Sequence, residues 1–206
     1  MVVAEAQDTD PQHLRSTATN LMQLWAKRGA GYPPGQIRDH ALMAKDLERP
    51  KEQSDVLTML RSAPQTLTAL VSGLDEADAL KQVGQEWSIA EIVAHLVHGE
   101  WAWFTRIRLM ATQDEPRMKV FPDSDHIPPL AESLTGYLRN RVEDLDFLEG
   151  LTPQGWARSG KHEVWGDIDI LWAARHLAAH DAEHLAQISR LRGSSESGRT
   201  VSGQDL

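Results

Sequence analysis

The spacing of apolar residues limits the fold of this chain more than any other feature of its sequence. Apolar side chains recur at every third or fourth position through four segments, residues 54–73, 89–110, 130–148 and 168–192. Residues at that spacing share one face of an α-helix, whereas the strict alternation typical of half-buried strands is almost absent. The pattern predicts an all-α protein whose core is a four-helix bundle made of residues 54–192.

Two of these segments carry local signals about their helices. Ser88 and Glu91 match a capping box, in which each side chain accepts a hydrogen bond from the backbone N–H of the other residue. We therefore expect the second helix to begin at Ile89. Pro64 lies inside the first segment, and because proline lacks a backbone N–H, it predicts either a kinked helix or two short helices.

The connections that follow the second and third helices are long. Residues 113–129 contain four prolines and are long enough to form a lid or the rim of a pocket. Residues 150–166 read as an irregular, aromatic segment. We expect Asp167 to cap the fourth helix, Gly193 to end it, and residues 193–206 to form a flexible tail.

The first 50 residues form a separate part of the chain. Apolar periodicity predicts helices at residues 13–28 and 36–47, on either side of a turn rich in glycine and proline at 29–35. We expect residues 1–50 to be an N-terminal helical extension packed outside the bundle. Such an extension would cap the bundle or provide an oligomer contact, for example in a homodimer.

Charge and composition exclude several classes of function. Lys and Arg number 21 against 30 Asp and Glu, which gives a formal net charge of −9. Because an acidic surface without a basic cluster repels phosphate and anionic lipid, we expect no nucleic-acid partner and no membrane partner. The chain has no cysteine, which excludes disulfides, zinc–thiolate sites and cysteine nucleophiles. The acidic N-terminus is unlike a signal peptide, so we expect a cytoplasmic protein.

Histidines on two of the expected helices suggest a metal site. His180 and His184 are four residues apart, so they lie about 40° apart around the helix and about 6 Å apart along it. Two imidazoles at that spacing can bind one ion, although an exposed histidine pair shows the same spacing. His95, on the second helix, would complete a set of three neutral ligands if the two helices are antiparallel.

Other polar residues near these histidines are candidates for the surroundings of the site. Gln187 is expected to hydrogen-bond a ligand imidazole. His98 and His176, each about one turn from a ligand, are candidates for supporting the ligands from behind or for lining the pocket. His162 is a candidate for the pocket rim. The segment HDAEH at 180–184 also fits a peptidase signature that would need Glu183 as general base, but the 22 residues after it leave little room for a further ligand.

Two motifs give the chain a resemblance to the DinB/YfiT-like metal-binding four-helix bundles. WSIAEIVAHL at residues 87–96 looks like the first metal motif of that family, and HDAEHLAQI at 180–188 looks like the second. The resemblance covers about residues 54–192 and implies an up-down-down-up bundle that holds a divalent ion, often zinc or nickel. It assigns the ion to three ligands: His95, His180 and His184.

The resemblance implies three classes of function. Members of the family include S-transferases that use a low-molecular-weight thiol, so our first expectation is a metal-dependent transferase that combines a small-molecule substrate with a thiol cosubstrate. The alternatives are a metal-dependent hydrolase and a non-enzymatic metal-binding bundle. No catalytic residue is assigned. Arg139, Arg141 and Arg175 are candidates for holding the carboxylates of a thiol, although we expect each of them to form surface salt bridges.

Overall fold

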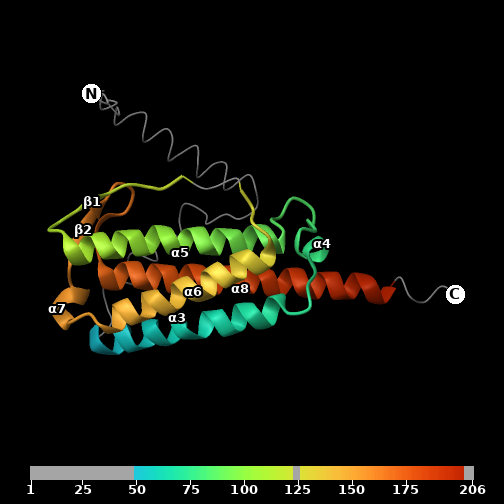
Figure 1. Cartoon of the computed structure of the whole chain (residues 1–206), viewed down its shortest axis with the longest axis horizontal. Helices are drawn as coiled ribbons and strands as arrows, with labels where there is room; N and C mark the ends of the chain where they lie inside the picture. Colours follow the sequence, from blue (N-terminus) through green and yellow to red (C-terminus); the bar gives the residue numbers. More distant parts are fainter. Residues whose placement is uncertain (1–48, 123–125, 202–206) are drawn as a thin grey trace, which may run out of the picture.

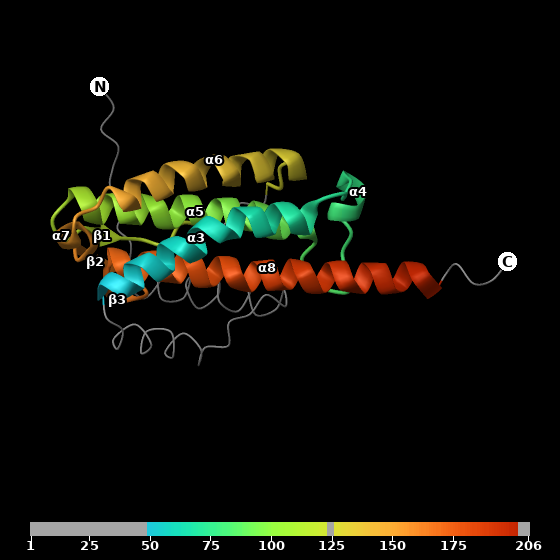
Figure 2. The same ribbon diagram turned by 90° about the horizontal axis from the view of Figure 1, so that it is seen from below.

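Four long helices lie side by side in the computed structural model of the protein, which describes residues 49–122 and 126–201. Figures 1 and 2 show them packed along one another in two perpendicular views. They are α3 (Arg49–Val71), α5 (Ile89–Thr112), α6 (Leu130–Glu149) and α8 (Ile170–Val201). The predicted all-α four-helix bundle is confirmed. The helices predicted at 13–28 and 36–47 lie outside the described residues, and the division into extension, bundle and tail stays a prediction.

The bundle has an up-down-down-up order. Ion pairs join Glu100 to Arg141 and Arg108 to Asp144, so residue numbers increase together along α5 and α6 and these two helices are parallel. Figure 1 shows α3 and α8 running together in the opposite direction. The order implied by the family resemblance is therefore present.

The parallel arrangement of α5 and α6 explains the length of the connection at residues 113–129. A chain that leaves the end of one helix must return along the whole bundle to begin a parallel neighbour, as Figure 1 shows. Within this connection, Arg117–Met118 forms the short strand β1. The expected role of the segment as a lid or pocket rim stays a prediction.

A small sheet covers the end of the bundle where α8 begins. The segment at 150–166, expected to be irregular, contains helix α7 (Pro153–Trp156) and strand β2 (Ser159–His162), and strand β3 (Gly166–Asp169) follows. The sheet has the order β1-β2-β3, with β1 and β2 parallel and β2 and β3 antiparallel. Strands of two and four residues are too short to show a clear alternation in the sequence, which is why they were not predicted.

Local capping signals were correct at α5 and wrong at α8. The backbone N–H of Ser88 donates to Glu91 Oε2 at 2.7 Å, and that of Glu91 donates to Ser88 Oγ at 3.3 Å, so the capping box is confirmed. The short helix α4 (Glu76–Ala79) precedes it. Asp167 does not cap α8, because it lies in β3. Asp169 instead accepts a hydrogen bond from the backbone N–H of Trp172 at 2.8 Å.

Helix α8 is longer than expected. It continues through Gly193 to Val201, although we expected Gly193 to end it. A glycine inside a helix costs only about 1 kcal/mol relative to alanine and therefore does not have to terminate it. No helix within the described residues combines the length and the apolarity that crossing a bilayer requires.

Helix α3 continues across Pro64 as one helix. A proline at this position cannot donate to the carbonyl of Leu60, which a regular helix would use as the acceptor. The guanidinium of Arg141, on α6, donates to that carbonyl from Nη1 at 2.9 Å. The acceptor that Pro64 leaves without a helical donor is thus satisfied by another helix.

A buried polar layer separates two apolar cores. The cores contain residues such as Leu60 and Ile107 at the sheet-bearing end, and Leu67 and Ile188 at the other end. The polar layer consists of four side chains contributed by α5, α6 and α8: Glu100, Tyr137, Arg141 and Asp181. Arg141 is only 1% exposed, so the expectation that it forms a surface salt bridge was wrong.

Candidate metal centre

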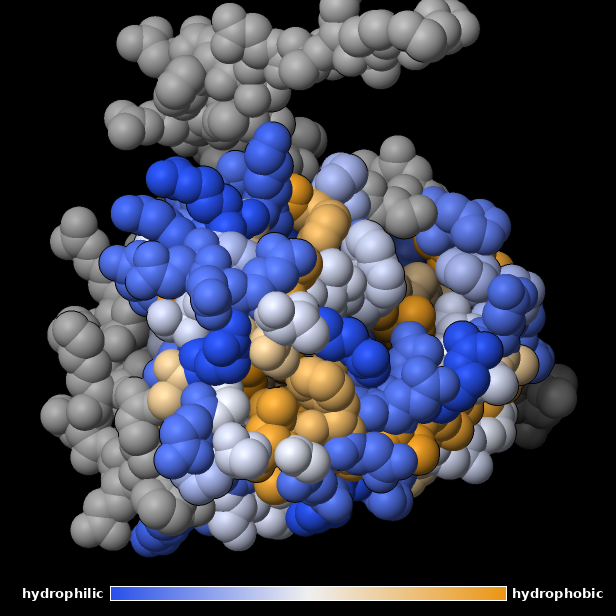
Figure 3. Space-filling view, turned by 60° about the vertical axis from the view of Figure 1, so that its left-hand side comes forward, coloured by the Kyte–Doolittle hydropathy of each residue, from blue (hydrophilic) through white to orange (hydrophobic). Residues whose placement is uncertain are grey.

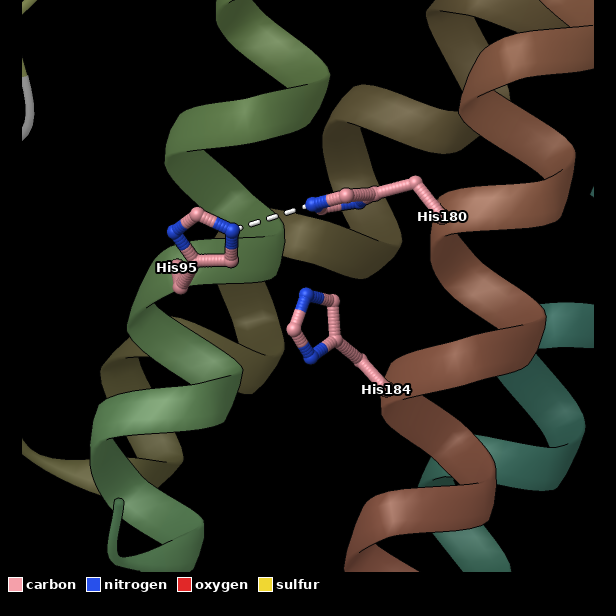
Figure 4. Close-up of side chains that lie close together, drawn as sticks. All are labelled: His95, His180 and His184. Atoms are coloured by element: carbon pink, nitrogen blue, oxygen red, sulfur yellow. Dashed lines mark hydrogen bonds between the residues drawn. The ribbon is translucent and has the colours of Figure 1, made fainter. Parts of the chain in front are cut away.

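Three imidazoles converge between α5 and α8. His95 comes from α5, and His180 and His184 come from successive turns of α8 (Figure 4). The Nε2 atoms of His95 and His180 are 3.0 Å apart, and each of the three histidines offers a nitrogen within 4.8 Å of the others. Ligand nitrogens around a tetrahedral ion lie about 3.3 Å apart, so small side-chain movements would bring the set to that geometry. The structure therefore brings together the three residues singled out by the sequence.

Gly99 makes room for one of these rings. It lies on α5, one turn after His95, and a Cβ built on it would be 3.0 Å from Cε1 of His180. That separation is shorter than an ordinary contact between carbon atoms. A side chain at residue 99 would therefore require the imidazole of His180 to shift by a few tenths of an ångström.

All three imidazoles are held neutral. Burial, followed by the charges of His184 and His98, lowers the pKa of His95 to about 3. Burial is also the main reason that the pKa of His180 lies well below 6.5 and that the pKa of His184 is lowered. Metal ions bind the unprotonated imidazole, so the site has the protonation state that coordination requires at neutral pH.

Gln187 sets the orientation of His184. Its Oε1 lies 3.0 Å from Nδ1 of His184, and an amide oxygen at that distance accepts a hydrogen bond from an Nδ1–H group. The lone pair of the ring is then on Nε2, a buried atom without a hydrogen-bond partner. This combination of a fixed tautomer and an unused buried lone pair is what a metal ligand needs, and it shows that the residues fit an ion.

The surroundings of the three histidines differ from side to side. His180 and His184 are 8% and 2% exposed, whereas His95, on the α5 side of the cluster, is half-buried. The indole of Trp87 lies with its ring centre 4.9 Å from that of His95. Asp181, next to His180 in sequence, accepts hydrogen bonds from Tyr137 and Arg141 in the polar layer and so ties this turn of α8 to α6.

His98 and His176 lie beside the cluster, and their charges contribute to lowering the pKa values of His95 and His180, respectively. The ring of His98 is 5.6 Å from that of Trp101. The ring of His176 lies 4.6–5.2 Å from the rings of Trp103, Trp165 and Trp172. Their predicted part in the surroundings of the metal stays a prediction.

Glu183 does not join the histidines. Its side chain is exposed, whereas His184, the next residue, is buried. In the part of the chain that the structure describes, the metal-ligand cluster contains three histidines and no carboxylate. The peptidase interpretation, which needs Glu183 as a general base, is therefore not supported.

Three features of the site were missed in the sequence. Gly99 stands in the middle of a predicted helix, and an interior glycine is a usable signal of close packing. Trp87 begins the WSIAEIVAHL motif, but no role was predicted for its ring, and its contact with His95 gives it a place at the site. The pairing of Asp181 with Arg141 joins positions 40 residues apart, and no local pattern in the sequence indicates it.

Comparison with known proteins agrees with the fold and with the type of site. Residues 59–188 match the family model of the DinB superfamily. The "Putative metal-dependent hydrolase GK0616" of Geobacillus kaustophilus is 26% identical over 151 residues, which cover 68% of this chain and 84% of that protein. A protein of Geobacillus thermodenitrificans with the same description is 27% identical over 153 residues, covering 70% of this chain and 86% of its own.

Two solved structures share the fold. YfiT from Bacillus subtilis, described as "a probable metal-dependent hydrolase with an unusual four-helix bundle topology", superposes with a TM-score of 0.67 and 17% identity over 74% of this chain and 91% of its own. The four-helix bundle protein TT2238 superposes with a TM-score of 0.51 and 21% identity over 66% of this chain and 96% of its own. At these identities the structures support the bundle architecture alone.

Proposed function

The chain belongs to the DinB superfamily, and from this membership and its three convergent imidazoles we propose that it is a metal-dependent hydrolase of a small-molecule substrate. The observation that carries the proposal is the cluster of His95, His180 and His184, whose ligand nitrogens lie within 4.8 Å of one another. The curated relatives described as metal-dependent hydrolases support this choice over a thiol transferase, which no relative named above supports.

The side chains of this protein would hold one divalent ion and keep it accessible. A bound divalent ion supplies Lewis acidity, which polarises a carbonyl or phosphoryl oxygen and makes water more acidic. His95, His180 and His184 contribute neutral nitrogens, so none of the ion's positive charge is cancelled by its ligands. Gln187 holds His184 in the tautomer that presents Nε2. A set of three protein ligands leaves a position for substrate, as catalytic sites do.

We propose zinc or nickel as the ion. A ligand set made only of imidazole suits first-row transition metals, whereas calcium and magnesium prefer oxygen ligands. Carboxylates of the described residues do not join the cluster, which argues against the two oxygen-preferring ions. A hydrolase with such a site would act on an ester, an amide or a related bond, because each offers an oxygen for the ion to polarise.

The test is metal loading followed by turnover measurements on the full chain. We expect elemental analysis to find about one ion per chain after reconstitution with zinc or nickel, and chelation to abolish hydrolysis of at least one substrate in a panel of esters, amides and phosphoesters. His95→Ala and His184→Ala should each lose the ion. Glu183→Ala is the matched control, because it changes an exposed residue beside His184 on the same helix and should keep the ion.

Three results would overturn the proposal. If the His95 and His184 variants retain metal as well as the parent chain, the site is elsewhere. If the loaded protein hydrolyses nothing but joins a thiol to an electrophile in a parallel assay, the reaction is the transfer that the sequence first suggested. A loaded protein that does neither, and loses only thermal stability on chelation, has a structural ion.

A further inference from the structure

Arg106 is a buried arginine without a carboxylate partner. Its side chain, on α5, is 5% exposed. Within the described residues it forms no ion pair at 4.0 Å or less, and its one hydrogen bond runs from Nη2 to the carbonyl of Lys119 at 2.8 Å. Its Nε–H group is buried and has no acceptor. Charged side chains are almost never buried in this way unless a counter-charge accompanies them.

The aromatic contacts of Arg106 compensate only in part for this burial. Its guanidinium carbon lies 4.9 Å from the ring centre of Trp103 and 4.6 Å from that of Phe121. Such cation–π contacts stabilise a buried charge only modestly. Burial lowers the pKa of Arg106 to about 10, and the charge of Glu163 opposes this shift. The Oε1 atom of Glu163 is already occupied as the acceptor of the Val120 backbone N–H. Arg106 thus retains unused capacity to bind an anion.

His162, on strand β2, provides a second unused donor. Its Nδ1 accepts hydrogen bonds from the backbone N–H groups of Val164 and Trp165 at 3.2 and 3.3 Å, so the proton of the neutral ring is on Nε2. The side chain is 2% exposed, and Nε2 is buried without a partner. A buried donor without an acceptor destabilises a fold by about 1–3 kcal/mol, and each such group in a protein calls for an explanation.

Both donors belong to one neighbourhood at the sheet-bearing end of the bundle. The ring of His162 lies 5.9 Å from that of Trp103, the same ring that Arg106 covers. The positive charge of Arg106 is close enough to contribute to lowering the pKa of His162. Figure 3 turns this end of the molecule toward the reader and shows apolar residues gathered in the middle of the face, surrounded by hydrophilic ones.

We propose that Arg106 and His162 form a subsite that binds an oxyanion, the carboxylate or phosphate group of a small molecule. A guanidinium matches the two oxygens of either group, and the Nε2–H of a neutral imidazole supplies one more hydrogen bond without needing a charge. The indole of Trp103 would exclude water from one side, which strengthens both interactions. The subsite goes beyond the proposed hydrolysis and does not depend on it.

The subsite is connected to the histidine cluster along α5 and α8. Arg106 is three helical turns beyond His95, about 16 Å along the axis of α5. Between them, the ring of Trp103 contacts that of His176, which is one turn before His180 on α8. This row of aromatic rings between α5 and α8 therefore runs from the subsite toward His180.

Anion binding to the full chain tests the inference directly. Inorganic phosphate and acetate, added in separate titrations, are expected to give saturable changes in the nitrogen chemical shifts of the His162 ring. The stronger of the two probes identifies the preferred oxyanion. Metal is removed beforehand with a chelating resin, so no soluble chelator competes for the subsite and a failure of the histidine cluster to bind an ion would not affect the result.

Two variants and one control separate binding from folding. Arg106→Gln removes the charge and should weaken anion binding about tenfold or more. His162→Asn keeps an acceptor near the position of Nδ1 but removes the Nε2 donor, and should weaken binding by a smaller factor. Arg108→Gln is the matched control: Arg108 also covers a ring, that of Phe147, but it is half-exposed and paired with Asp144. Its affinity should equal that of the parent.

Three outcomes would overturn the proposal. The first is the absence of a saturable shift with either probe, which would mean that the two donors bind only water. The second is an equal loss of affinity in Arg108→Gln, which would mean that the anion responds to general surface charge. The third is unchanged anion binding in both single variants, His162→Asn and Arg106→Lys. These two variants test the placement of the two donors even if Arg106→Gln fails to fold.

Discussion

Gly99 and His180 face each other across the α5–α8 interface, so closely that a single methyl group on the glycine would press against the imidazole. A Cβ on Gly99 would lie 3.0 Å from Cε1 and 3.6 Å from Nδ1 of that ring. The position of one predicted metal ligand therefore depends on the absence of a side chain from the opposite helix.

Gly99→Ala should weaken metal binding without destabilising the helix. Alanine favours a helix interior over glycine by up to about 1 kcal/mol. This gain offsets the cost of crowding His180, so the thermal stability of the metal-free chain should change little. The added methyl group must displace His180, and we expect the dissociation constant for zinc to increase about tenfold. Competition with a fluorescent chelator measures that constant.

Gly136→Ala is the control for this change. It makes the same substitution inside α6, where the new Cβ would meet its nearest neighbour, Val97, at an ordinary 3.9 Å. Its affinity for zinc should equal that of the parent chain. Equal affinity in Gly99→Ala as well would contradict the proposed crowding of His180.

Gln187→Met should lower metal affinity by about 10- to 100-fold. The change keeps the length of the side chain but removes the oxygen that faces Nδ1 of His184 at 3.0 Å, so the ring loses its fixed tautomer. Gln187→Glu retains an acceptor oxygen and should restore tight binding. Calorimetric titration of the three proteins with zinc is the measurement, and a glutamate variant as weak as the methionine variant would show that Gln187 acts only by packing.

Arg141→Met should destabilise the bundle by about 3–5 kcal/mol, because it leaves two buried carboxylates without their partner. Arg141 contacts Glu100 and Asp181 and also the Leu60 carbonyl that Pro64 leaves without a donor. Urea unfolding of the metal-free chain measures the free energy. Arg61→Met removes an exposed ion pair with Glu149 and should cost less than about 1 kcal/mol. If the two variants lose similar amounts of unfolding free energy, the buried polar layer contributes no more to stability than an exposed ion pair does.

The stability of the chain should fall in acid partly because of His162. Burial, and then the charge of Arg106, lowers the pKa of His162 to about 4, whereas an unfolded chain takes up this proton near pH 6.5. Below pH 6.5 the unfolded state therefore binds more protons than the folded state. The contribution of His162 to the free energy of unfolding is complete above pH 6.5 and is lost as the pH falls toward 4. At pH 5 the loss amounts to about 2 kcal/mol.

His162→Asn lacks this titration and provides the comparison. Unfolding free energies of both proteins at pH 7.5 and pH 5, with chelator present, should show a smaller decrease for the variant. Parallel decreases would place the pKa of His162 in the folded state near its ordinary value.

The sequence alone determined the features that depend on residues near one another in the chain. Helical periodicity identified α5 and α6 almost to their ends, and the capping box at Ser88 and Glu91 placed the start of α5. His180 and His184 could be paired because four residues make about one turn of a helix. His95 could be added to this pair only on the condition that the second and fourth helices are antiparallel, and the resemblance to a family then assigned it as a ligand. The parallel order of α5 and α6 also came from that resemblance.

The tertiary structure decided everything that depends on which helix faces meet. Arg141 reads as a surface residue, yet it is buried, because the carbonyl of Leu60, 81 positions away, and two carboxylates on other helices surround it. The small sheet forms because β1 reaches β2 across more than 40 residues, a pairing that short strands do not signal locally. Residue spacing does not specify how helix faces pack against one another. It therefore could not predict the burial of charge, the unpaired donors of Arg106 and His162, or the crowding at Gly99.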